Sequence, residues 1–170
     1  MNEIELLRTQ LATERSRVRE VASAGAAACS ATAGAAPGAV HGACAEYLGC
    51  VLGWFDERDA RLGELYSRRP AGDAGRTAYA ALGPGGRGRE ALERLAARGD
   101  TREGWQALAQ FINGPWDARR GAIEALLAAN PRVADWRAYG GIDADSISRE
   151  RALYARCRAA LAAGVTPGPA

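Results

Sequence analysis

The chain has 170 residues, which is enough for one domain with a hydrophobic core but short for two. All 22 basic residues are arginines, and 20 acidic residues leave a net charge of +2. This small surplus disfavours a nucleic-acid-binding protein, because such proteins concentrate a larger positive charge on one face. The sequence contains no run of 18 uncharged apolar residues, so it predicts no membrane span, and the charged N-terminal segment lacks the apolar core of a signal peptide. We therefore expect a cytoplasmic protein.

The first predicted helix covers residues 2–29. Its apolar residues recur at heptad spacing, and Glu14 occupies a position of that series where an apolar side chain is expected. A loop rich in Gly and Ala separates it from a second helix at 39–67. The apolar face of this second helix is interrupted by Arg58 or Asp59.

Gly and Pro are frequent after the second helix, which predicts a loop before a short helix at 89–98. A capping-box sequence then begins a third long helix, at 101–129. Its apolar stripe contains Arg119, and the Gly114–Pro115 pair predicts a kink rather than a break, because the stripe keeps its spacing on both sides.

The fourth long helix is predicted at 145–162, and Glu150 lies within its apolar stripe. Residues 163–170 are expected to form a disordered tail. No segment alternates polar and apolar residues for long enough to predict a strand. The sequence therefore predicts an all-α fold in one domain, residues 1–162, as an up-and-down bundle of four long helices with one short helix inserted.

The charged residues on the apolar stripes, Glu14, Arg119 and Glu150, are the first candidate site. A charged side chain that is buried without a partner is strongly destabilising, so each of them needs a counter-charge or a ligand. If the helices bring them to one level, they form either a ligand-binding site or a self-neutralised polar layer. The arginine among two acids favours the polar layer, and we expect the three side chains to be in contact.

His41 is the only histidine, and Cys44 follows it about one helical turn later. Zinc and non-haem iron sites normally use several His or Cys ligands, so these two residues are only weak candidates for a metal site. The four cysteines include no CxxC pair and are expected to be reduced thiols. No catalytic constellation or cofactor-binding loop is recognisable, so the sequence assigns no catalytic residue, cofactor or metal.

Two combinations of tryptophan and arginine are candidate interface anchors: Trp116 with Arg120, and Trp136 with Arg137. Both residue types are frequent at the centres of protein interfaces. Packing of each tryptophan against its neighbouring arginine within the fold is the alternative interpretation.

The layout of long amphipathic helices, with HGACAEYLGCVLGWFDERD in the second and IDADSISRERALY at the start of the last, resembles that of hemerythrin-like four-helix bundles. The resemblance implies a non-haem di-iron centre held by histidines and carboxylates, which binds dioxygen or senses iron and redox state. This chain departs from the family pattern because it has one histidine and no HxxxH pair. The resemblance therefore transfers no catalytic residue.

The expected function is that of a non-catalytic regulatory, accessory or assembly subunit that acts through contacts with another protein subunit or with a second copy of itself. The alternative is a helical bundle that binds a small molecule or a metal through its buried carboxylates. In the metal-binding case it would be hemerythrin-like and could have an oxidative function. Binding of nucleic acid through arginine-rich helix faces is a weaker third possibility.

Overall fold

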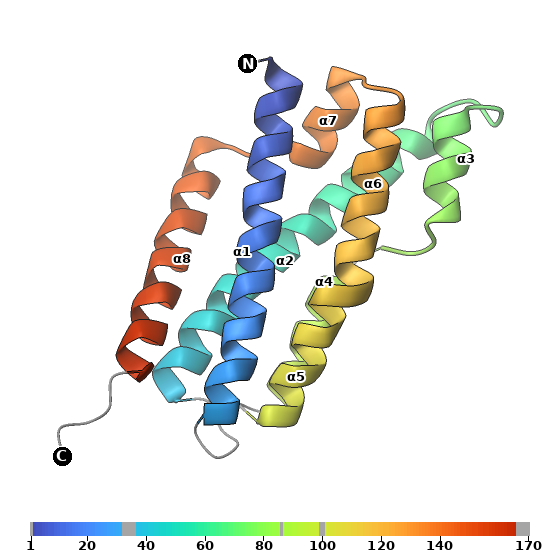
Figure 1. Cartoon of the computed structure of the whole chain (residues 1–170). Coiled ribbons are helices and arrows are strands. Elements are labelled where there is room, and N and C mark those ends of the chain that lie inside the picture. The colour runs from blue at the N-terminus through green and yellow to red at the C-terminus, as the bar shows by residue number, and fades with distance from the viewer. Residues whose placement is uncertain (1, 32–36, 86, 99–100, 166–170) are drawn as a thin grey trace, which may run out of the picture.

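The computed structural model describes residues 2–31, 37–85, 87–98 and 101–165, and this part of the chain consists of helices and their connections, without strands (Figure 1). The prediction of an all-α fold is confirmed. None of the described helices is long and apolar enough to cross a bilayer. The helical elements are α1 (Glu3–Ala31), α2 (Gly38–Ser67), α3 (Ala74–Ala81), α4 (Arg87–Arg98), α5 (Arg102–Phe111), the π turn η1 (Ile112–Trp116), α6 (Asp117–Ala129), α7 (Val133–Gly140) and α8 (Ala144–Val165).

The arrangement is more elaborate than the predicted four long helices and one short helix. The short helices α3 and α7 are additional, and α8 continues three residues beyond the predicted end at 162. The last five residues of the predicted tail, 166–170, lie outside the described residues. Helix α3 begins where the Asp73 side chain accepts a hydrogen bond of 2.8 Å from the backbone N–H of Arg76. Such N-terminal capping stabilises a helix of this length.

Helix α2 is the centre of the fold. It packs against α1, α4, α7 and α8, and in Figure 1 it crosses behind α1 and α6. Because α2 has neighbours on several sides, its buried residues extend around much of its circumference instead of forming one narrow stripe. The fully buried side chains on this helix include Tyr47, Leu48, Val51, Leu52, Phe55 and Leu62.

Helices α5 and α6 are joined by the π turn η1, so the helical path continues from 102 to 129 through the predicted kink. Pro115 lies inside the turn, where its missing N–H removes one backbone hydrogen bond. A π turn uses more residues per revolution than an α-helix and therefore shifts the inward face of the helix that follows. As a result Arg120, and not its neighbour Arg119, is the fully buried arginine of α6.

Candidate functional site

Glu14 on α1 is buried, with 3% of its surface exposed, and it forms an ion pair with Arg58 on α2. The distance between Arg58 Nη1 and Glu14 Oε2 is 2.6 Å, and the Gln10 side chain donates a further hydrogen bond to Glu14 Oε1 at 3.1 Å. Arg58 is 1% exposed. The pair therefore consists of two side chains removed from water, each of which supplies the counter-charge that the other requires.

Glu150 on α8 is also 3% exposed, but its partners are different. Arg17 Nη1 lies 2.6 Å from Glu150 Oε2, and the Tyr47 hydroxyl donates to Glu150 Oε1 at 2.9 Å. Burial and the nearby Glu150 carboxylate raise the pKa of Tyr47, because ionisation would place a second negative charge there. Tyr47 consequently remains a hydrogen-bond donor to Glu150.

Asp59 on α2 binds the two neighbouring arginines of α6. Arg119 donates through Nε at 2.7 Å and through Nη2 at 3.0 Å, while Arg120 Nη2 lies 2.8 Å from Asp59 Oδ2. Tyr79 of α3 donates to the Asp59 carboxylate and, at 2.7 Å, to its backbone carbonyl. Burial disfavours the charged carboxylate, but the hydrogen bond from Arg119 and the charge of Arg120 outweigh burial and lower the pKa of Asp59.

These contacts correct the expectation that Glu14, Arg119 and Glu150 form one cluster. In the described part of the chain no ion pair or hydrogen bond joins any of the three to another. Each is neutralised by a different partner. The physical reason is that the chain carries a nearer counter-charge for each of them, and two of these counter-charges are Arg58 and Asp59 on α2.

A further ion pair, between the buried Asp135 on α7 and the partly buried Arg69, was not identified from the sequence. Arg69 Nη2 lies 2.6 Å from Asp135 Oδ2, and the Arg69 guanidinium stacks 4.1 Å from the centre of the Tyr66 ring. Burial and the Asp135 charge raise the pKa of Tyr66 to about 12. Asp135 directly precedes Trp136 in the sequence, which is the one local sign that it faces the core.

The candidate metal ligands do not form a metal site. His41 Nδ1 accepts a hydrogen bond of 3.2 Å from the Trp105 indole, and the Cys44 sulfur lies 3.1 Å from that of Cys157. Among the described residues no group of three or more His, Cys, Asp or Glu side chains converges on one point. Since Glu14 and Glu150 both bind arginines, the residues present do not fit the di-iron centre that the hemerythrin-like resemblance implies.

The tryptophans of the predicted interface pairs are buried in this chain, so they are not surface anchors. Trp136 is 1% exposed, whereas Arg137 points to solvent and pairs with Glu3. Trp116 is 3% exposed and packs edge-on against the Phe55 ring, at 5.1 Å between ring centres. Both tryptophans contribute apolar area to the core, which explains their positions without a partner.

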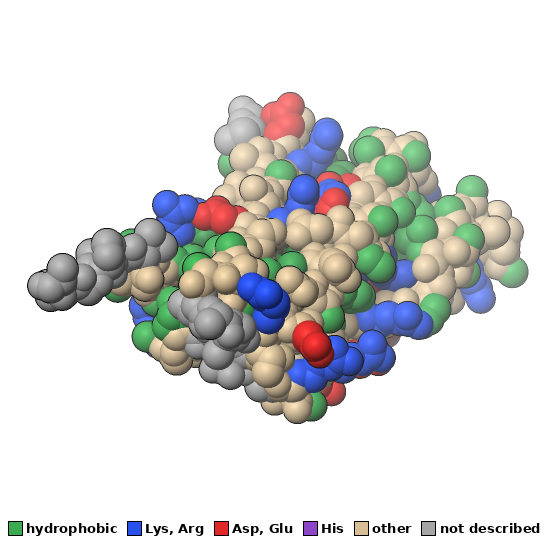
Figure 2. Space-filling view, turned by 60° about the horizontal axis from the view of Figure 1, so that its bottom comes forward, with side chains coloured by type: hydrophobic (Ala, Val, Ile, Leu, Met, Phe, Trp, Pro, Cys, Tyr) green, Lys and Arg blue, Asp and Glu red, His purple; other side chains and the backbone are tan. Residues whose placement is uncertain are grey.

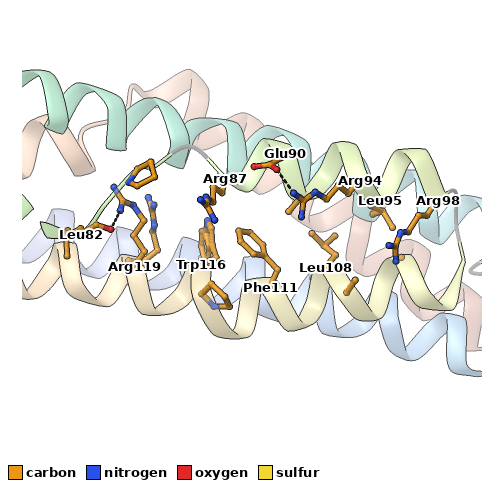
Figure 3. Close-up of a pocket in the computed structure, with 17 residues that line it drawn as sticks. Leu82, Arg87, Glu90, Arg94, Leu95, Arg98, Leu108, Phe111, Trp116 and Arg119 are labelled. Carbon is orange, nitrogen blue, oxygen red and sulfur yellow. Dashed lines mark hydrogen bonds and ion pairs between the residues drawn. The ribbon is translucent and has the colours of Figure 1, made fainter. Parts of the chain in front are cut away.

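Trp116 and Arg120 also form part of the wall of a groove of about 510 Å³. Helix α4 forms one side of this groove, and α5, η1 and α6 form the other (Figure 3). Its floor is apolar and consists of Leu95, Leu108, Phe111 and Trp116. We refer to it as the α4–α5 groove. Its volume lies within the usual range of ligand-binding pockets, which is roughly 300–1,000 Å³.

Arginines surround this apolar floor. They are Arg87, Arg94, Arg98, Arg119 and Arg120, and among the described lining residues the only carboxylate is Glu90, which pairs with Arg94. Arg119 and Arg120 share the single charge of Asp59. Three positive charges are left over, and Arg87 and Arg98 have no ion-pair partner among the described residues. The groove is therefore apolar inside and cationic along its edges.

Two donors in the groove wall lack acceptors. Trp116 Nε1 and Arg120 Nε are buried and make no hydrogen bond within the described structure. An unpaired buried donor costs roughly 1–3 kcal/mol, and an acceptor bound in the groove that reached these atoms would remove this cost.

The signal for the groove was present in the sequence. Arg87, Arg94 and Arg98 are spaced by seven and four residues, which places them on one face of a helix. Sequence reasoning recognised the helix, at 89–98, but could not show that this face lies opposite Phe111 and Trp116.

The remaining surface offers few alternatives for an apolar interface. Among the described residues only Leu6 and Val133 are large exposed hydrophobic side chains, at 51% and 39%. On the face shown in Figure 2, basic and acidic side chains interrupt the hydrophobic ones. Searches against protein-family models, curated proteins and solved structures found no match to this chain. The choice of site therefore depends on geometry and charge alone.

Proposed function

We propose that this protein is a non-catalytic regulatory or accessory subunit that binds an acidic, partly apolar segment of a partner protein in the α4–α5 groove. The observation that carries this proposal is the combination of an apolar floor with three arginine charges that no carboxylate of the described residues compensates. Such a surface favours an occupant that has hydrophobic anchors and carboxylates on adjacent sides.

Helix α4, on one side of the groove, is long enough for a helical segment to lie along it. Helix α4 has 12 residues and is therefore about 18 Å long, which matches roughly three turns of a bound amphipathic helix. Leucine or aromatic side chains of the segment would contact Phe111 and Leu108. Its acidic residues would pair with Arg87 and Arg98, whose side chains have no competing carboxylate among the described residues.

The lining residues support binding rather than chemistry. Apart from the arginines and Glu90, the described lining consists of Gly, Ala, Pro, Leu, Phe and Trp. Glu90 is exposed and paired with Arg94. The described lining thus contains no adjacent nucleophile and base, which acyl or phosphoryl transfer by side chains would require.

The test is site-specific photo-crosslinking in the native host, with p-benzoylphenylalanine at Ala107, an exposed residue of the groove lining. The matched control places the same group at Ala155, an exposed residue of α8. We expect a discrete protein adduct from position 107 and none from position 155, and the partner should be attached through an acidic segment. The yield of this adduct should be at least about tenfold lower in R87E/R98E. The reversal R151E, on the exposed face of α8, should leave the adduct unchanged.

Equal adducts from both positions, or an adduct that survives R87E/R98E, would contradict the proposal. An adduct with a second copy of this chain would identify the groove as a homodimer interface instead. Binding of the purified partner should weaken as salt increases, because exposed charges are screened over about 10 Å at 0.1 M ionic strength.

A small anionic ligand is the second candidate, favoured by the groove volume and by the unpaired donors of Trp116 and Arg120. The probe for this candidate is 8-anilinonaphthalene-1-sulfonate, an aromatic anion whose fluorescence rises in apolar sites. Saturable binding of one dye per chain, lost in R87E/R98E and retained in R151E, together with no protein adduct at Ala107, would favour a small ligand over a partner protein.

A further inference from the structure

Two cysteines from distant parts of the sequence lie side by side in the core. Cys44 belongs to the second turn of α2 and Cys157 to the second half of α8, and their sulfur atoms are 3.1 Å apart. Both side chains are fully buried. The sulfurs are close enough that a shift of about 1 Å would reach the length of a disulfide bond.

The thiols differ in their readiness to ionise. When Cys44 is the donor in the hydrogen bond between the two sulfurs, that bond lowers the pKa of Cys157 and, together with burial, raises the pKa of Cys44. Thiolates are the nucleophilic form of cysteine, so Cys157 is the first of the two to react and Cys44 is the second.

The access route restricts the oxidant. Neither thiol is reached by solvent in the described structure, so a bulky disulfide such as oxidised glutathione cannot attack without extensive opening of the fold. A small uncharged oxidant needs only a local fluctuation. The pair lies about two turns from the start of α2 and from the end of α8, where Gly164 faces Val40, and helix ends open more readily than helix centres.

From these observations we propose that Cys44 and Cys157 form a site of reversible oxidation by peroxides, which links α2 to α8 by a disulfide. The Cys157 thiolate attacks one peroxide oxygen; the S–O bond forms, the O–O bond breaks and the leaving hydroxide takes up a proton as water. Cys44 then attacks the resulting sulfenic acid, the S–S bond forms and a second water leaves. Two thiols lose two electrons in total, and hydrogen peroxide is reduced to two waters.

This inference is independent of the α4–α5 groove. The thiols lie between α2 and α8, whereas the groove lies between α4 and α5, so failure of one proposal leaves the other untouched. Oxidation would close a covalent loop of more than a hundred residues and would prevent α8 from separating from α2. Such a cross-link removes conformational entropy from the unfolded chain and should raise the melting temperature by about 5–10 °C.

The experiment treats the folded full-length protein with stoichiometric hydrogen peroxide and then counts thiols after denaturation. The four thiols should fall to two, with the loss of two hydrogens in intact mass and a linked peptide pair containing Cys44 and Cys157. Dithiothreitol should restore all four thiols. Oxidised glutathione at the same concentration should react far more slowly and leave no glutathione adduct on either residue.

Variants provide the controls. C50S changes a half-buried cysteine elsewhere on α2 and should leave the linkage and the melting shift intact. In C44S, Cys157 has no thiol to resolve its sulfenic acid, and dimedone added together with the denaturant should label it. A linked pair that includes Cys29 or Cys50, or stepwise over-oxidation of wild type without a link, would overturn the proposal. The wild-type peptide map decides this even if a variant fails to fold.

Discussion

Replacement of Arg58 by leucine tests the energetic role of the buried pair with Glu14. The Glu14 carboxylate is 3% exposed, and in the R58L variant Gln10 would be its one remaining hydrogen-bond donor among the described residues. Loss of one partner of a buried ion pair costs about 3–5 kcal/mol, because the remaining charge stays desolvated and uncompensated. In a chain of 170 residues this corresponds to a drop of roughly 10 °C in melting temperature.

The double variant E14L/R58L separates this penalty from the net contribution of the pair. Apolar replacement of both partners is often close to neutral, so the double variant should recover most of the lost stability, with a coupling energy of about 3 kcal/mol. The assay is urea unfolding followed by circular dichroism. R61L is the matched control because Arg61 is exposed on the same helix, and it should change stability by less than about 0.5 kcal/mol.

Two results would refute the reasoning. If R58L is no less stable than R61L, then Arg58 does not neutralise a buried carboxylate. If E14L/R58L is as unstable as R58L or worse, then lost packing, including the contact of Arg58 with the Phe55 ring at 5.1 Å, accounts for the penalty rather than unpaired charge.

The other predictions concern acid stability, helix packing and the single histidine. The folded-state pKa of Asp59 is lowered, so the stability that its carboxylate contributes is present above pH 4 and is lost as the pH falls through that lowered value. In urea unfolding between about pH 2 and 5, the free energy of unfolding of D59N should therefore depend less on pH than that of the wild type. G25A places a methyl group 2.4 Å from the Trp105 ring and should destabilise the fold by about 1–3 kcal/mol. G42A, which has open space around it in α2, should stabilise the fold by about 0.5–1 kcal/mol. Equal melting temperatures of the two variants would contradict this packing. H41A removes the acceptor of the Trp105 indole and should cost about 1–3 kcal/mol with a change in tryptophan emission; unchanged emission and stability would exclude the hydrogen bond.

Helix type and approximate limits could be predicted because they depend on local periodicity. The limits of the first two helices were correct within about two residues, and the stripe patterns marked Glu14 and Glu150 as inward-facing. The partners of these charges could not be predicted, because they depend on the relative rotation and height of separate helices. Glu14 could have met Arg58, Arg119 or Arg120 with equal support from the pattern.

The arginine of α6 illustrates a second limit. The stripe marked Arg119, but the π turn at Pro115 changes the rotation of all later residues, and Arg120 becomes the buried one. The sequence indicated an irregularity at Gly114–Pro115 without revealing its form. The α4–α5 groove was missed for a related reason, since a groove is a relation between two helix surfaces and no single helix pattern contains it.

The buried ion pairs of α2 have a consequence for how the helices find their alignment. Alanine accounts for 39 of the 170 residues, and alanine-rich helices have smooth surfaces that can slide past one another with little change in packing. Arg58 pairs with α1 and Asp59 pairs with α6, from adjacent positions on one helix. A slip of one turn by either neighbour would leave a charge stranded among apolar side chains. The ion pairs therefore fix the axial register of α1 and α6 relative to α2.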